Sequence, residues 1–149
     1  EYRPKVFPGV ILRLKEIEEV ALIFRTGKMI CTGADSEKQA YNAINNIINE
    51  LNKAGIIEMK KPNIKIQNIV ASANIHAKID LDSLAYKIDN MIYEPEQIPC
   101  LIYRMDNPKV VIGIFGTGKI NIMGAKREED IYKAVEKLRI LLAEKKVIY

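Results

Sequence analysis

Apolar positions in the first part of the chain follow two spacings, which predict short strands and then an amphipathic helix. Residues 10–14, 20–24 and 28–32 are short apolar runs of the kind that forms strands. Ser36 is a suitable cap for the helix that follows. The apolar stripe of this helix would consist of Ala40, Ala43, Ile44, Ile47, Ile48 and Leu51. The spacings predict an antiparallel meander followed by a helix.

A longer stretch with the same two spacings follows. Residues 63–75 are rich in isoleucine with partial alternation, which predicts a strand. Residues 80–91 have helical spacing and offer Asp80 or Asp82 as the cap. Their apolar positions are Leu81, Leu84, Ala85, Ile88 and Met91.

The last part of the chain repeats the meander and helix. We expect strands at 101–105, 110–115 and 119–123, with a hairpin tip at Thr117-Gly118. A helix begins near Glu128, and its apolar stripe is Ile131, Val135, Leu138 and Leu142. The predicted fold class is α+β, with antiparallel sheets.

The chain contains an internal duplication. When the sequence is aligned with itself at an offset of 91 residues, about 18 of the 58 overlapping positions are identical and no gap is needed. The identical pairs include Tyr2 and Tyr93, Pro8 and Pro99, Arg13 and Arg104, and the Thr-Gly-Lys triplets at 26–28 and 117–119. We therefore predict two homologous repeats, at 1–61 and 62–149.

By this alignment the first repeat lacks the opening strand and helix of the second. The counterpart of residues 62–91 would lie before Glu1. We expect the working protein to include roughly 30 more residues there, because one edge of the first sheet would otherwise be unpaired.

Two predicted strands, 20–24 and 110–115, contain no polar residue. An antiparallel sheet with helices on one side usually has a polar second face. Something must therefore cover the second face. The sequence leaves open whether this is another layer or a second copy, or whether the apolar face binds a partner.

Composition narrows the function. The chain is 48% hydrophobic and 28% charged, which suits a folded domain, and no apolar run is long enough to span a membrane. The net charge of +4 favours an anionic partner. Cys31 and Cys100 are far apart and His76 is the only histidine, so we predict no metal site, no cofactor and no enzymatic activity.

Residues 113–119 imitate a phosphate-binding loop. The stretch GIFGTGK matches most of GxxxxGK[ST], but Ile120 stands where the hydroxyl is needed, and a strand follows instead of a helix. A hairpin whose glycines Gly116 and Gly118 adopt positive φ explains the motif better.

The residues of the second repeat carry a specific resemblance. The segments YEPEQIPCLIYRM at 93–105, PKVV at 108–111, IFGTGK at 114–119, KIQNIV at 65–70 and GAK at 124–126 resemble the TATA-box-binding protein family. The resemblance runs through essentially the whole chain. It implies a saddle formed by two pseudo-symmetric halves, with one curved antiparallel sheet and helices on the convex face.

The family resemblance implies a general transcription factor. Its concave face would bind the minor groove of A·T-rich promoter DNA and bend it with apolar wedges, a mode of binding for which this family is itself the standard example. The implied partners are promoter DNA, a B-type initiation factor and the RNA polymerase machinery, with no membrane and no small-molecule substrate. The location would be the cytoplasm, at the nucleoid, in an archaeon, which the segment 47–55 favours, or the nucleus in a eukaryote. A paralogue that acts mainly through protein interactions with relaxed DNA preference is the alternative.

The resemblance also assigns DNA-binding positions. Phe7 and Phe24 match the two wedge phenylalanines of the first repeat. Phe115 matches one wedge phenylalanine of the second repeat, and Ile98 stands where the other is expected. The remaining groove positions are Pro8, Pro99, Leu22, Ile30, Thr32, Asn68 and Val70, and the second repeat departs from the pattern at Gly113, Asn121 and Met123.

Charged positions are assigned in the same way. The implied phosphate contacts are Arg13, Lys28, Arg104, Lys119 and Lys126, with Asp35 in place of a lysine in the first repeat. Glu94, Glu96 and Gln97 match the loop that binds the B-type factor, while the corresponding residues 3–6 are basic. An acidic loop suits a basic partner.

Overall fold

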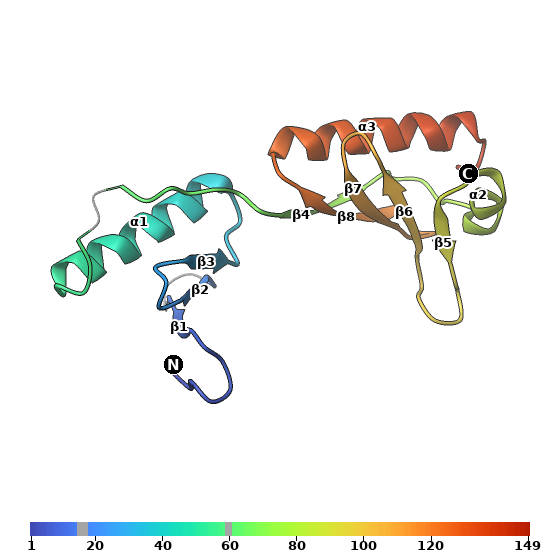
Figure 1. Ribbon diagram of the computed structural model, residues 1–149. Helices are drawn as coiled ribbons and strands as arrows, with labels where there is room; N and C mark the ends of the chain where they lie inside the picture. The colour runs from blue at the N-terminus through green and yellow to red at the C-terminus, as the bar shows by residue number, and fades with distance from the viewer. Residues whose placement is uncertain (15–17, 59–60) are drawn as a thin grey trace. The chain divides into compact units, whose positions relative to one another are not determined.

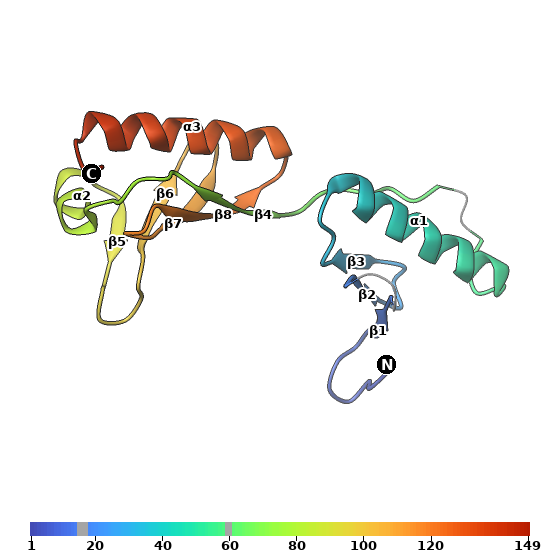
Figure 2. The same ribbon diagram turned by 180° about the vertical axis from the view of Figure 1, so that it is seen from behind.

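The structure, a computed structural model, describes residues 1–14, 18–58 and 61–149, which form two units, Glu1–Lys65 and Ile66–Tyr149 (Figures 1 and 2). Each unit contains an antiparallel sheet and at least one helix. The predicted α+β class is confirmed.

Unit 1 is a three-stranded meander followed by a helix. The strands β1 (Val10–Arg13), β2 (Val20–Ile23) and β3 (Met29–Thr32) pair in chain order, and α1 (Glu37–Lys53) follows them. The Ser36 hydroxyl accepts the N–H of Gln39 at 3.1 Å, which confirms the predicted cap. The buried apolar side chains of this unit are Ala21, Ala43, Ile47 and Ile48.

Unit 2 contains a five-stranded sheet in the order β4-β8-β7-β6-β5. The strands are β4 (Ile69–Asn74), β5 (Met91–Tyr93), β6 (Leu101–Met105), β7 (Val110–Ile114) and β8 (Lys119–Ala125). The helices are α2 (Leu81–Lys87) and α3 (Glu128–Glu144), and α3 runs along one face of the sheet in both views (Figures 1 and 2). Its Leu138 and Leu142 pack with the sheet residues Ile112, Ile114, Ile120 and Ile122, all fully buried.

Three expectations for unit 2 are wrong. The predicted strand 63–75 begins only at Ile69, because β4 pairs with β8 and Ile69 is opposite Ala125, the last residue of β8. The predicted helix 80–91 ends at Lys87, because Asn90 has a φ of 64° and turns the chain into β5. Gly118 has the expected positive φ at the hairpin tip, but Gly116 does not.

Corresponding positions of the two sheets differ in how well they are covered. Val10 and Leu12 are 38% and 36% exposed, whereas Leu101, the counterpart of Val10, is fully buried. In unit 2 the helix α2 contacts the neighbouring strand β5, and the described part of unit 1 has no such helix. Among the described residues, fewer apolar side chains are buried in unit 1 than in unit 2.

Candidate nucleic-acid interface

Each sheet has one face toward its helix and one face that no helix of its own unit covers. In β8, Ile120 and Ile122 are buried in the core, while the residues between and beside them, Lys119, Asn121 and Met123, are exposed. Side chains alternate between the two faces of a strand, so these three residues share the uncovered side. We call this side the open face of unit 2.

Strand register identifies the rest of the open face of unit 2. Asn121 lies opposite Gly113 of β7 and opposite Ser72 of β4, and Met123 lies opposite Val111. The same alternation adds Val70, Asn74, Ile102 and Arg104.

Unit 1 has a corresponding open face. Leu22 of β2 lies opposite Ile30 of β3, and Val20 lies opposite Thr32. Ala21, between Val20 and Leu22, is fully buried. The unalternating apolar runs are thus explained, because one set of side chains enters the core and the other set lines the open face.

The predicted wedges of unit 1 lie together. The rings of Phe7 and Phe24 are in edge-to-face contact, with their centroids 5.7 Å apart at 62°. Gly9 makes this possible, since a Cβ there would lie 2.8 Å from Cε1 of Phe7 and 3.3 Å from Cε1 of Phe24.

The wedge positions of unit 2 are arranged differently. Ile98, 38% exposed, replaces the ring of Phe7, so Phe115 has no aromatic partner at this position. Cys100 stands at the counterpart of Gly9, and its Sγ lies 3.6 Å from where a Cβ of Gly113 would be. Pro8 and Pro99 are exposed next to the two wedges.

Asn68 is oriented by a backbone contact. Its Oδ1 accepts the N–H of Gly124 at 2.8 Å, which leaves the two amide hydrogens of Nδ2 directed elsewhere. Val70, two residues further on, is 63% exposed. Together they extend the open face at the beginning of β4.

Four of the five predicted phosphate contacts are unpaired. Arg13, Lys28, Arg104 and Lys119 are exposed, and none has an ion pair or a side-chain hydrogen bond within residues 1–14, 18–58 and 61–149. Lys28 and Lys119 lie at the matching hairpin tips, where their carbonyl groups accept the N–H of Phe24 and Phe115. Lys126 instead donates to the carbonyl of Gln67.

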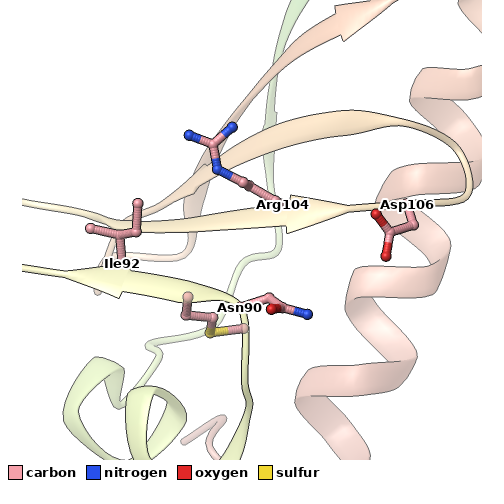
Figure 3. A pocket seen from close by; sticks show the side chains of 5 residues that line it. Asn90, Ile92, Arg104 and Asp106 are labelled. Carbon is pink, nitrogen blue, oxygen red and sulfur yellow. The ribbon is translucent and has the colours of Figure 1, made fainter.

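Arg104 lines a shallow hollow of about 370 Å³ beside β5, together with Asn90, Met91, Ile92 and Asp106 (Figure 3). The guanidinium of Arg104 extends from β6 away from the Asp106 carboxylate (Figure 3). The cation is therefore available to an anionic ligand on this side of the sheet.

The predicted partner loop is a tight, exposed turn. The N–H groups of Gln97 and Ile98 both donate to the carbonyl of Glu94 at 2.9 Å, and the exposed side chains of Glu94, Glu96 and Gln97 border a hollow of about 290 Å³. Residues 3–7 form the same turn, with Val6 and Phe7 donating to Arg3. The two turns thus share a backbone geometry and carry opposite charge.

Sequence reasoning missed several residues of the open faces. Ser72, Asn74 and Cys100 gave no signal, because their positions beside the groove residues follow from strand pairing between distant segments. Val20, Val111 and Ile102 could have been found, since each lies next to a buried residue in its strand, whereas Ile11 joins the open face only through its pairing with Leu22. Within the described ranges no group of three His, Cys, Asp or Glu side chains gathers, and no described helix is long and apolar enough to cross a membrane.

Two repeated α+β units, each with an open sheet face that carries apolar side chains and exposed, unpaired cations, suit the binding of an extended polyanion such as a nucleic acid. The sequence profile of the family described as transcription factor TFIID, or TATA-binding protein, matches residues 1–54 and 63–145. The chain belongs to this family of transcription factors.

Individual relatives agree with the family assignment. The TATA-box-binding protein of Pyrobaculum calidifontis is 52% identical over 149 residues, covering 100% of this chain and 75% of the relative. That of Sulfolobus acidocaldarius is 51% identical, covering 97% and 73%. The solved structure of Methanococcus jannaschii TBP superimposes with a TM-score of 0.91 at 48% identity and covers 97% of this chain and 82% of its own.

Proposed function

We propose that this chain binds the minor groove of A·T-rich TATA promoter DNA through its open faces, bends the duplex and serves as the platform for the initiation machinery. The observation that carries the proposal is the combination of apolar side chains and unpaired cations on the open faces in a chain of this family. The relatives named TATA-box-binding proteins support the choice of DNA.

The open faces suit the minor groove chemically. The groove offers few distinguishing groups, and A·T pairs lack the amino donor of guanine, so the apolar side chains of the open faces bury no base-pair donor without a partner. Phe7 and Phe24 would enter an opened base step, and easily unstacked TA steps favour this. The four free cations would bind phosphates and set affinity without choosing sequence.

A direct test uses fluorescence anisotropy with a TATA duplex and a scrambled duplex of the same composition. We expect the TATA duplex to bind at least tenfold more tightly, and energy transfer between dyes at its two ends to rise on binding as the duplex bends. Equal affinity for the two duplexes would contradict TATA recognition. The same result would favour the second candidate, an interaction module with relaxed DNA preference, to which the departures at Gly113, Asn121 and Met123 point.

The acidic turn at Glu94–Gln97 is the proposed contact for the B-type initiation factor. Reversing its charge with Glu94→Arg and Glu96→Lys should weaken recruitment of that factor to the DNA complex at least tenfold. The matched control is Arg3→Glu with Lys5→Glu, which reverses the corresponding basic turn. Equal loss in both variants would show that the acidic turn has no special role.

A further inference from the structure

The centres of the two open faces differ in a matched pair of residues. In unit 1, Leu22 lies directly opposite Ile30, and two apolar side chains fill the space. The corresponding residues of unit 2 are Gly113 and Asn121, which also lie directly opposite each other. A gap and an amide thus replace two apolar side chains.

The backbone of unit 2 does not require a glycine at position 113. Gly113 is not among the residues with positive φ, and an added Cβ would have only the Sγ of Cys100 within 4 Å, at 3.6 Å. A Cβ would therefore fit at Gly113, which is itself a buried residue, in ordinary contact with Cys100. A glycine inside a strand often marks a site where a ligand approaches closely, and here it places no side chain opposite Asn121.

The amide of Asn121 is held in place by a neighbour. The Ser72 hydroxyl donates to Oδ1 of Asn121 at 3.0 Å across the β4–β8 pair. The amide oxygen can accept a second hydrogen bond, and Nδ2 keeps both donors without a partner in the described chain. Unit 2 therefore presents an ordered acceptor, Oδ1 of Asn121, opposite the glycine at position 113.

The minor groove of a G·C pair differs from that of an A·T pair by one group, the guanine N2 amino donor. Against Leu22 and Ile30 this donor would be buried without a partner, which is unfavourable. Gly113 places no side chain against it, and Asn121 Oδ1 can accept its hydrogen. We infer that Gly113, Asn121 and Ser72 form a recognition pocket for the guanine amino group, so that unit 2 accepts a G·C pair in its part of the site while unit 1 requires A·T.

The inference rests on the proposed function, and its test separates the two. An A·T-rich TATA duplex is prepared with each base pair replaced in turn by G·C or by inosine·C, which lacks only the N2 amino group. Binding of the full chain to each duplex is measured by anisotropy. We expect the ratio of Kd for G·C to Kd for inosine·C to be about ten or more at most positions and one or less at one position bound by unit 2.

Variants assign the tolerant position to the pocket. Gly113→Leu with Asn121→Ile gives unit 2 the residues of unit 1 and should raise the ratio at that position to about ten. The matched transfer, Leu22→Gly with Ile30→Asn, should create a second tolerant position. Ratios for one variant are unaffected by changes in its overall affinity, and circular dichroism verifies folding. Asn121→Ile alone, at an exposed position, serves if the double variant fails to fold.

The outcomes are distinct. A ratio of about ten at every position of a tightly bound TATA duplex overturns the pocket and leaves the proposed function intact. A tolerant position that persists in Asn121→Ile also overturns it. Failure to prefer the unmodified TATA duplex over a scrambled one overturns the proposed function itself.

Discussion

Gly9 and Cys100 occupy matching positions in the two repeats. The size of each is matched to the wedge residue two positions before it, Phe7 and Ile98. The ring of Phe7 lies over Gly9 so closely that a Cβ would be 2.8 Å from it. Cys100 carries a side chain at this place, so a ring at position 98 could not lie over the backbone as Phe7 does. The residues Ile98 and Cys100 therefore form a coupled change from the arrangement of unit 1.

The coupling predicts how the second wedge can be restored. Ile98→Phe with Cys100→Gly should recreate the ring pair with Phe115, deepen the bend and slow dissociation, because an aromatic wedge covers more of an opened base step. Ile98→Phe alone should gain less, since its ring meets the Cys100 side chain. End-to-end energy transfer and stopped-flow dissociation measure both effects. Equal gains from the single and double variants would refute the coupling.

The two wedge sites should also differ in how much binding they contribute. Phe24→Ala removes half of a ring pair, whereas Ile98→Ala removes a smaller aliphatic side chain. We expect Phe24→Ala to weaken DNA affinity more, by roughly tenfold relative to Ile98→Ala, since more stacked surface is lost. Anisotropy titrations with the TATA duplex test this, and equal losses would remove the asymmetry between the two wedges.

Glu19 is a charged residue in an apolar position. It is 1% exposed, and neither carboxylate oxygen has a hydrogen-bond partner among the described residues. Burial raises the pKa of Glu19, the charge of Asp35 raises it further, and the Gln39 amide opposes the shift. The counterpart in unit 2 is Val110, which is buried in the core.

Glu19→Val should stabilise unit 1 at neutral pH by about 1–3 kcal/mol, because it removes a buried carboxylate for which the Gln39 amide compensates only in part. A carboxyl whose pKa is higher in the folded than in the unfolded chain favours the protonated state, so stability is lost as pH rises above 4.5 through the folded pKa. The variant should lose this dependence. Hydrogen exchange of the α1 amides between pH 4.5 and 8 measures it, and equal slopes for both proteins would contradict the prediction.

At the scale of elements, the two long helices begin in the same way but only one is capped. Ser36 and Arg127 are both extended N-cap residues at matching positions, with φ of −151° and −136°. The Ser36 hydroxyl accepts the Gln39 N–H, while Arg127 makes no cap hydrogen bond and instead contacts Asp130 at 3.4 Å. The first turn of α3 thus lacks the side-chain cap that α1 has.

Exchanging the caps should have opposite effects on the two helices. Ser36→Ala should destabilise unit 1 by about 1 kcal/mol, and Arg127→Ser should stabilise unit 2 by a similar amount, since a serine hydroxyl satisfies a free N–H of the first turn. The lost contact with Asp130 is a surface ion pair and should cost little. Urea unfolding with site-resolved hydrogen exchange tests both, and a destabilised Arg127→Ser would contradict the capping argument.

The elements that the sequence predicted well are those with local signals. Ser36 and Glu128 mark the beginnings of α1 and α3. The predicted stripe of α1 contains its three buried residues, and that of α3 contains Leu138 and Leu142 but misses the buried Ala134. The errors at 63–68 and 88–91 depend on distant partners, namely the end of β8 and the pairing of β5 with β6. The same holds for the candidate site: the family resemblance, not a local pattern, assigned Phe7, Phe24 and Asn121, and the neighbour Ser72 follows from the pairing of β4 with β8.

For the molecule as a whole, the free cations predict a dependence of DNA affinity on salt. Each phosphate contact should lower log affinity by about 0.9 per decade of salt. Lys28→Ala and Lys119→Ala should each reduce this slope by about 0.9, whereas Lys126→Ala should have less effect because Lys126 contacts Gln67. Lys53→Ala, on α1 and paired with Glu50, is the control. A wild-type affinity independent of salt would exclude phosphate binding.

The duplication gives the chain two sheets that share an antiparallel meander. A protein with two identical repeats would bind a nearly palindromic duplex equally well in either orientation. The oppositely charged turns at 3–7 and 94–97 and the differing pairs Leu22–Ile30 and Gly113–Asn121 remove that equivalence. Roughly 1.4 kcal/mol between the two orientations is enough for a tenfold preference. The residues by which the repeats have diverged can therefore fix the orientation in which the protein binds such a duplex. One orientation defines which side of a symmetric promoter element is upstream and which is downstream.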